Sequence, residues 1–214
     1  MAGHLATPPA SAGAELDIHA TPQPAGGVDT PHGAPPDAAV DTVVEDQRAE
    51  RTELPVALER LGALLSATLS AEGVPGPARV DLTLVDPPVI ADLNASQLGG
   101  SGPTDVLSFP LDPWEDPWPT AAIDGDHGAE VRFVGDVVLA PAVAEAQAED
   151  HAGTFADELA LLVVHAGLHL AGHDHAEPPE RAAMVARERA VLARHWGTLA
   201  ANPWVDTHAA GGAP

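Results

Sequence analysis

The helix predicted over 154–171 constrains the fold of this chain more than any other feature. Phe155 and the run from Leu159 to Val164 make this helix apolar on nearly every side. A helix of that kind is usually buried, so other elements must cover it. Thr154 can cap its start, because a threonine hydroxyl accepts a hydrogen bond from the free backbone amides of a first turn. We therefore expect this helix in the interior of the domain.

The end of the same helix carries a pattern of metal ligands. His165 and His169 are four residues apart, so they share one face of the helix, with Cβ atoms about 5–6 Å apart. Gly172 can end the helix in a left-handed turn, after which His175 can supply a third imidazole. The spacing His-x-x-x-His-x-x-Gly-x-x-His is that of the metzincin zinc site, and three histidines leave one tetrahedral position open. The pattern predicts one zinc ion per chain.

The residue after the first ligand decides which reaction such a site can support. Metzincins place glutamate there as the general base, whereas this chain has Ala166. A peptidase mechanism of that type therefore lacks its base. Two candidate catalytic residues remain nearby. His173 can be a ligand or a proton donor, and Asp174 can carry a proton, orient a ligand imidazole or simply cap the turn.

The other elements alternate between helical and strand patterns. Helical spacing of apolar residues also covers 57–69, 87–98, 141–150 and 178–196, and strand patterns cover 40–44, 80–84, 106–109 and 133–139. This order predicts an α+β or mixed α/β fold: a single domain with one small mixed sheet covered by helices. The zinc site then lies on the buried helix and the turn after it.

Composition separates the folded part from two tails. Residues 1–38 contain seven prolines, four acidic residues and no aromatic residue. Such a segment buries too little apolar area to offset its ordering entropy, so we expect a disordered, acidic, Pro/Ala-rich tail. The domain is expected over 39–197 and a flexible C-terminal tail over 198–214. Within the domain, 111–130 has six acidic residues, three prolines and no arginine or lysine, which predicts an acidic loop insertion.

The charge and the cysteine count exclude several classes of protein. The chain has 32 acidic residues, 9 arginines, no lysine and no cysteine, with a formal charge of -23. Disulfide partners, thiolate zinc sites and cysteine nucleophiles are therefore excluded. Evenly spread acidity repels nucleic acid and anionic membranes, so any nucleic-acid role needs local contacts. We see no secretory signal and no apolar run long enough to span a bilayer, and we expect a cytoplasmic protein without a membrane partner.

Three segments resemble one known family. Residues 165–175 are similar to the motif His-Gly-x-Leu-His-Leu-x-Gly-Tyr-Asp-His of the YbeY family, bacterial endoribonucleases of ribosomal RNA maturation. Residues 102–110, Gly-Pro-Thr-Asp-Val-Leu-Ser-Phe-Pro, resemble its Pro-Thr-Asp-Val-Leu-Ser-Phe-Pro segment. A third similar segment is Gly-Asp-Val-Val-Leu at 135–139, which Pro141 follows. The order and spacing of the segments also fit, and the resemblance covers about 40–197.

The resemblance implies an α+β domain with zinc on His165, His169 and His175. It also implies a zinc-dependent, single-strand-specific endoribonuclease, a hydrolase of phosphodiester bonds. Such an enzyme acts in maturation of the 3′ end of small-subunit ribosomal RNA and in ribosome quality control, with ribosomal RNA and the small ribosomal subunit as partners. The alternatives are a ribosome-assembly binding protein with structural zinc, or a metal-dependent hydrolase of another substrate.

Two points of the implied mechanism stay open. The nucleophile is either a water activated by zinc or the 2′-hydroxyl of the RNA. Candidate substrate-binding residues come from the second segment, in which Thr104, Asp105 and Ser108 either line the cleft or only form a turn and a strand end.

The chain departs from the family at Leu98. Many members carry arginine four residues after an asparagine that precedes the Pro-Thr-Asp segment, close to the metal, as a candidate phosphate ligand. Counting from Asn94, this place is Leu98, and no arginine or lysine lies between residues 79 and 132. In addition, His173 replaces the family's tyrosine and Ala166 its glycine. These departures predict weak RNA binding, with the phosphate ligand absent or supplied from elsewhere.

Overall fold

The computed structural model describes residues 40–111 and 131–205. The tail expected over 1–38, nearly all of the acidic loop expected over 111–130, and residues 206–214 lie outside the described residues. The described elements follow the expected order, and the long helix expected over 87–98 is an α-helix that continues as one π-helical turn, η1. Their bounds are β1 (Val40–Asp46), α1 (Leu58–Ala71), β2 (Ala78–Leu84), α2 (Pro87–Leu93), η1 (Asn94–Leu98), β3 (Val106–Pro110), β4 (Arg132–Leu139), α3 (Pro141–Ala148), α4 (Phe155–Leu170) and α5 (Pro178–His195).

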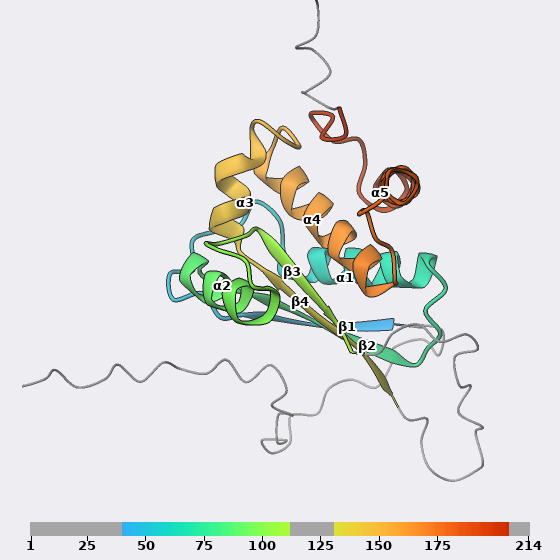
Figure 1. The fold of residues 1–214 in the computed structure, drawn as a ribbon, viewed down its shortest axis with the longest axis horizontal. Helices are drawn as coiled ribbons and strands as arrows, with labels where there is room; N and C mark the ends of the chain where they lie inside the picture. Colours follow the sequence, from blue (N-terminus) through green and yellow to red (C-terminus); the bar gives the residue numbers. More distant parts are fainter. Residues whose placement is uncertain (1–39, 112–130, 206–214) are drawn as a thin grey trace, which may run out of the picture. The chain divides into compact units, whose positions relative to one another are not determined.

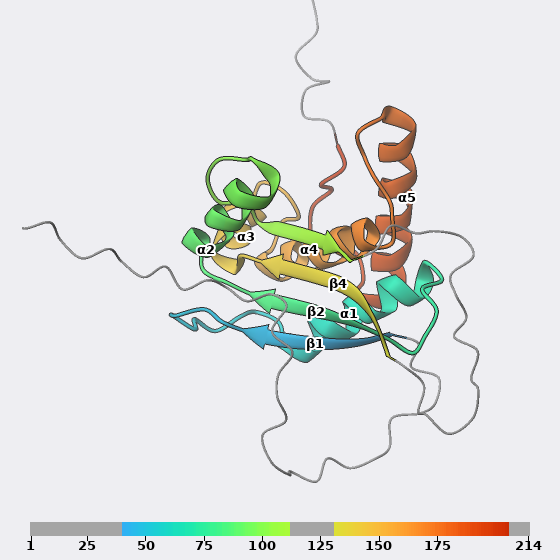
Figure 2. The same ribbon diagram turned by 60° about the horizontal axis from the view of Figure 1, so that its bottom comes forward.

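The four described strands form one mixed sheet in the order β1-β2-β4-β3 (Figure 2). Strands β1, β2 and β4 run parallel, with Val44 opposite Leu82 and Leu82 opposite Val137. Strand β3 is antiparallel to β4 and lies at the edge of the sheet. The α+β class and the small mixed sheet predicted from the sequence are confirmed.

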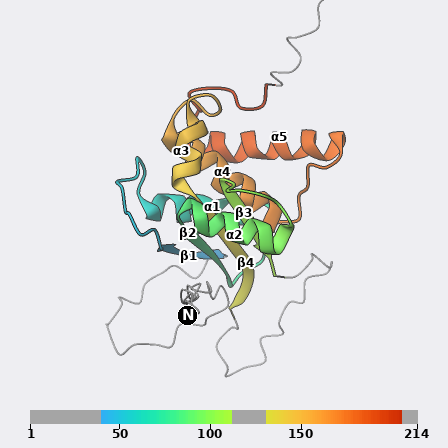
Figure 3. The same ribbon diagram turned by 60° about the vertical axis from the view of Figure 1, so that its left-hand side comes forward.

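Helices cover both faces of this sheet. Successive residues of a strand point to opposite faces. Val137 and Leu139 of β4 belong to the main core beneath α1 and α4, whereas Val138 packs with Ile90 of α2 in a smaller cluster. Figure 1 shows α1 and α4 together on one side of the strands, and Figure 3 shows α2 in front of them. The longest apolar helix is thus enclosed, and no described helix is long and apolar enough to span a bilayer.

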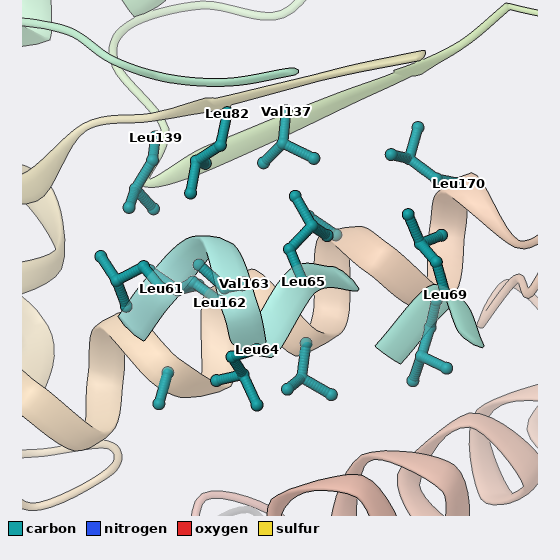
Figure 4. Packing of buried hydrophobic residues seen from close by; sticks show 14 of the residues in the cluster. Leu61, Leu64, Leu65, Leu69, Leu82, Val137, Leu139, Leu162, Val163 and Leu170 are labelled. Carbon is teal, nitrogen blue, oxygen red and sulfur yellow. The ribbon is translucent and has the colours of Figure 1, made fainter. Parts of the chain in front are cut away.

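The contact between α1 and α4 forms the centre of the core. Leu65 and Leu69 of α1 and Val163 of α4 belong to this core and have no exposed surface (Figure 4). Full burial of such a side chain stabilises the fold by about 1.5–3 kcal/mol. Gly167 lets the two helices approach closely, because a Cβ atom there would lie 3.0 Å from the side chain of Leu65. The predicted burial of the histidine-bearing helix is therefore confirmed, and α1 fixes its position.

The chain after α5 differs from the sequence expectation, which begins a flexible tail at residue 198. Leu199 and Trp204 pack against the main core. The backbone amide of Ala200 donates to Asp157 Oδ2 at 3.0 Å, and that of Ala201 donates to the carbonyl of Ala152 at 2.9 Å. The packed domain thus continues to residue 205. Small residues make up much of this segment, and backbone hydrogen bonds together with Leu199 and Trp204 hold it in place.

Candidate metal centre

Helix α4 and the turn after it bring the three predicted ligands together. His165 and His169 lie on the same face of the last two turns of α4. Gly172 follows in a left-handed conformation with φ of 87°, as predicted, and lets the chain turn back so that His175 faces the other two rings. One ring nitrogen of each histidine lies within 4.8 Å of the others. This is a group that can hold one metal ion.

Hydrogen bonds decide which nitrogen each helical histidine presents. Nδ1 of His165 donates to Oε1 of Glu188 at 2.8 Å, and Nδ1 of His169 donates to the backbone carbonyl of His173 at 2.9 Å. A carboxylate and a carbonyl can only accept, so each Nδ1 carries the proton and each neutral ring has a lone pair on Nε2. The two Nε2 atoms are 3.2 Å apart. Two lone pairs facing each other at this distance repel, and a metal cation between them removes the repulsion.

The surroundings keep His169 in the form that binds metal. Burial lowers the pKa of His169 below its ordinary value of 6.5, and the nearby rings of His165 and His175 lower it further. A neutral imidazole is the ligand form, since a protonated ring has no lone pair to donate. Three imidazoles suit zinc, and also copper and nickel. The residues present therefore fit a divalent transition metal.

Glu188 anchors the centre from the outer helix α5. This side chain is only 5% exposed, and its second oxygen, Oε2, accepts a hydrogen bond from the indole Nε1 of Trp204 at 2.6 Å. The guanidinium of Arg189 lies 4.7 Å from the Trp204 ring centroid. Both carboxylate oxygens of Glu188 therefore have a partner, and the carboxylate holds the His165 ring in one orientation. Partners of this kind orient metal ligands and increase their basicity.

The structure places His173 and Asp174 in the turn rather than at the metal. Nε2 of His173 lies 2.7 Å from Oε2 of Glu72, which also binds the guanidinium of Arg187. Oδ1 of Asp174 accepts from the backbone amide of His175 at 2.6 Å, and this bond lowers the pKa of Asp174. Both side chains thus stabilise the turn that carries the third ligand, and their predicted part in proton transfer stays a prediction.

A cavity of about 620 Å³ opens beside the three histidines. Its wall brings together the metal ligands and all three predicted substrate-binding residues, although the two groups are about 60 residues apart in the sequence. Strand β3 and the turn before it contribute Thr104, Asp105 and Ser108, and α5 contributes Arg181, Met184, Val185 and Glu188. The cavity is also lined by Leu98, His151 and Trp204. Binding of substrate by the first three residues stays a prediction.

A second buried carboxylate lies on the α3 side of the cavity. Glu158, near the start of α4, has no exposed surface. Nδ1 of His151 and the amide Nε2 of Gln147 each lie 2.9 Å from this carboxylate. Gln147 also donates to Oδ2 of Asp105, so a chain of hydrogen bonds joins the turn before β3 to His151. The Nδ1 atom of His151 faces Glu158, which leaves the opposite ring nitrogen for the cavity.

Four residues of this site are not predicted from the sequence: Glu188, Glu158, His151 and Trp204. Two of them leave a signal in the pattern. Glu188 stands between Met184 and Leu192 on the buried stripe of α5, and Glu158 precedes the apolar run of α4. A charged residue on an otherwise buried stripe needs a partner, which is the sign of a buried network. The partners lie on other elements or in the connection before α4, and no helical or strand pattern identifies them.

Comparisons with known proteins agree with this arrangement. The family model described as Endoribonuclease YbeY matches residues 44–195. Endoribonuclease YbeY of Moorella thermoacetica is 39% identical over 150 residues, which cover 70% of this chain and 94% of that protein. Endoribonuclease YbeY of Salinispora tropica is 44% identical over 134 residues, which cover 61% and 83% of the two chains. The solution structure of a Thermotoga maritima protein is 28% identical with a TM-score of 0.47, over 72% of this chain and 90% of that one. Because the family match spans the sheet, the buried helix and all three histidines, this chain belongs to the YbeY endoribonuclease family.

Proposed function

We propose that this protein is a zinc-dependent endoribonuclease that cuts single-stranded RNA. Its proposed role is maturation of the 3′ end of small-subunit ribosomal RNA and ribosome quality control, with the small ribosomal subunit as partner in the cytoplasm. Family membership supports the reaction class. The observation that carries the metal dependence is the pair of Nε2 atoms 3.2 Å apart in His165 and His169, each on a ring whose Nδ1 proton is already held.

The protein's own groups prepare the centre for zinc. Glu188 and the carbonyl of His173 fix the orientations of the His165 and His169 rings. The turn at Gly172 places the ring of His175 beside them. His165, His169 and His175 would hold the zinc, which would supply Lewis-acid chemistry toward a phosphodiester. Ala166 offers no carboxylate beside the first ligand, which favours a reaction other than peptide hydrolysis.

The β3 side of the cavity is proposed to bind the substrate. Both oxygens of Asp105 already accept hydrogen bonds, from Thr104 Oγ1, the Val106 amide and Gln147. Asp105 therefore positions this wall of the cavity rather than binding RNA itself. Thr104 and Ser108 both line the cavity, and we propose that the Ser108 hydroxyl donates to a phosphate while Thr104 Oγ1, whose proton is held by Asp105, accepts from a sugar hydroxyl.

We assign proton transfer to His151 instead of His173 or Asp174. His151 lines the cavity, and the buried carboxylate of Glu158 holds its Nδ1 at 2.9 Å. This contact orients the ring and holds its Nδ1 side away from the cavity. The opposite nitrogen can then exchange a proton with the attacking or leaving oxygen, whether the nucleophile is water or the 2′-hydroxyl.

The test is metal analysis followed by RNA cleavage. We expect about one zinc per chain, loss of single-strand cleavage after chelation and recovery on addition of zinc. His165→Ala removes both metal and cleavage, while His173→Ala, the matched control in the same motif, retains the metal. RNA binding without cleavage at full zinc occupancy would indicate an assembly factor with structural zinc. Turnover of small phosphoesters without any effect on RNA would indicate another hydrolase.

A further inference from the structure

A chain with a formal charge of -23 and no lysine repels RNA at long range, so the substrate strand needs a local cationic contact. The cavity itself adds two acidic residues, Asp105 and Glu188, to its wall. Among the described residues that line the cavity, Arg181 is the one arginine.

The guanidinium of Arg181 has no protein partner among the described residues, in contrast to five other arginines of the chain. Arg48, Arg79 and Arg187 each bind a carboxylate, and Arg60 and Arg189 lie over tryptophan rings. Arg181 makes no side-chain hydrogen bond, ion pair or ring contact with any residue that the structure describes. Its five donors and its charge are therefore available to a ligand in the cavity.

Helix α5 places this charge at a fixed position relative to the metal centre. Arg181 and Glu188 are seven residues apart, which is two turns, so they share one face of α5 with an axial separation of about 10.5 Å. Met184 and Val185 lie between them and line the same wall. Met184, Val191 and Leu192 are buried against the domain, so the helix cannot shift freely. One end of this wall holds His165, and the other end presents an unpaired guanidinium.

We propose that Arg181 binds a backbone phosphate of the RNA strand, next to the phosphodiester at the metal centre. This inference rests on the proposed function and deepens it. A guanidinium presents two parallel N–H donors to two phosphate oxygens, and its charge strengthens both hydrogen bonds. Arg181 is a substrate-binding residue in this scheme: it holds the strand and takes no part in proton transfer or metal binding.

The test compares Arg181→Ala with Arg194→Ala. Both changes remove one positive charge from α5, but Arg194 lies in the last turn, about 20 Å along the axis, and does not line the cavity. Affinity for a single-stranded RNA oligonucleotide is measured by fluorescence anisotropy on metal-stripped protein, which cannot cut the probe. Values of KM and kcat are measured on zinc-loaded protein, with zinc content and thermal stability as checks.

We expect Arg181→Ala to weaken RNA binding and raise KM by about tenfold or more, with kcat and zinc content unchanged. The slope of log affinity against log salt changes by about 0.7, the value for one contact to a single strand. Arg194→Ala changes affinity less than twofold. Arg181→Lys keeps the positive charge but lacks the two parallel N–H donors of the guanidinium, so it is expected to recover part of the affinity.

Equal effects of the two alanine variants would overturn the inference and leave the proposed function intact, because they would show a diffuse charge effect. A fall in kcat at unchanged KM and affinity would also overturn it. If the unaltered protein neither binds nor cuts RNA, the proposed function fails, and the inference fails with it. Arg181 is exposed, so folding is expected to survive, and Arg181→Lys supplies a second comparison if the alanine variant is unstable.

Discussion

The carboxylate of Glu188 accepts a hydrogen bond from Nδ1 of His165 at 2.8 Å and thereby ties α5 to the metal centre on α4. The second oxygen of the same carboxylate is bound by the indole of Trp204. The orientation of the first metal ligand therefore depends on a helix 23 residues further along the chain and on the segment after it.

The first prediction follows from this contact. Glu188→Ala removes the acceptor for the His165 ring and is expected to lower zinc affinity by about tenfold to a hundredfold. Glu188→Gln has a smaller effect, because one amide oxygen still accepts a hydrogen bond. Zinc affinity is measured by competition with a chromogenic chelator. Glu145→Gln, on the exposed side of α3, is the control for the loss of charge. Unchanged affinity in Glu188→Ala would show that the contact has no influence on the metal.

The second prediction concerns the ligand set. His165→Ala and His169→Ala are each expected to abolish tight zinc binding, since two imidazoles rarely hold zinc alone. His173→Ala keeps the metal, because its side chain faces Glu72 rather than the other rings. Zinc per chain is measured by elemental analysis after dialysis. Loss of zinc in His173→Ala together with full occupancy in His175→Ala would contradict the choice of third ligand.

The third prediction concerns pH in the metal-free protein. The pKa of His169 in the folded state is below its ordinary value of 6.5, so the unfolded chain binds more protons between these two values. The free energy of unfolding therefore falls as the pH is lowered from 6.5 toward the folded pKa. Denaturant titrations at several pH values with a chelator present measure this fall. We expect a shallower dependence in His169→Gln and an unchanged one in His195→Gln, which alters an exposed residue of α5. Identical curves for all three proteins would contradict the effect.

The helices, the strands and the three ligands could be predicted because their signals are local. Leu61, Leu65 and Leu69 repeat at helical spacing, and the histidines of α4 have their spacing fixed by the helix itself. The left-handed turn at Gly172 could be predicted because glycine tolerates a positive φ. Each of these features is complete within about 15 residues.

The supporting contacts could not be predicted, because they depend on how separate parts of the chain fold against one another. His151 is only seven residues from Glu158 but lies outside α4, in the connection that precedes it, and Trp204 meets Glu188 only because residues 198–205 return across the domain. The composition of the chain after Gly197 predicts a flexible tail, whereas Leu199 and Trp204 pack against the core. The order of this segment depends on backbone hydrogen bonds such as that from Ala201 to Ala152, which any residue except proline can donate.

The fourth prediction compares how much the two ends of the chain contribute to the stability of the domain. Deletion of residues 1–38 is expected to leave the melting temperature unchanged, because the composition of that segment offers little apolar area to bury. Truncation after Gly197 removes Leu199 and Trp204 from the core and is expected to lower stability by about 2 kcal/mol and to weaken zinc binding. Truncation after Val205 is the matched control and keeps these contacts. Thermal unfolding with and without zinc compares the three proteins. A large loss of stability in the first deletion would show that residues 1–38 pack on the domain.

The fifth prediction concerns Leu98, which is 62% exposed and lines the cavity together with the three histidines. A leucine there offers nothing to a phosphate, whereas an arginine adds one charge-assisted contact. Leu98→Arg is therefore expected to tighten binding of single-stranded RNA by about tenfold at unchanged zinc content. Leu111→Arg, an exposed leucine outside the cavity lining, is the control for net charge.

The salt dependence of the same binding distinguishes local from long-range effects. A basic protein loses RNA affinity as salt rises, because binding releases counterions. In this acidic chain, moderate salt first screens the long-range repulsion, which at physiological ionic strength is largely screened beyond about 8 Å. Affinity of the unaltered protein is thus expected to hold steady or improve between low and moderate salt, and to decline more in Leu98→Arg. A steep loss in the unaltered protein would show a local basic surface that outweighs the long-range repulsion. Equal gains in Leu98→Arg and Leu111→Arg would show that the RNA strand does not pass η1, because only the overall charge would then matter.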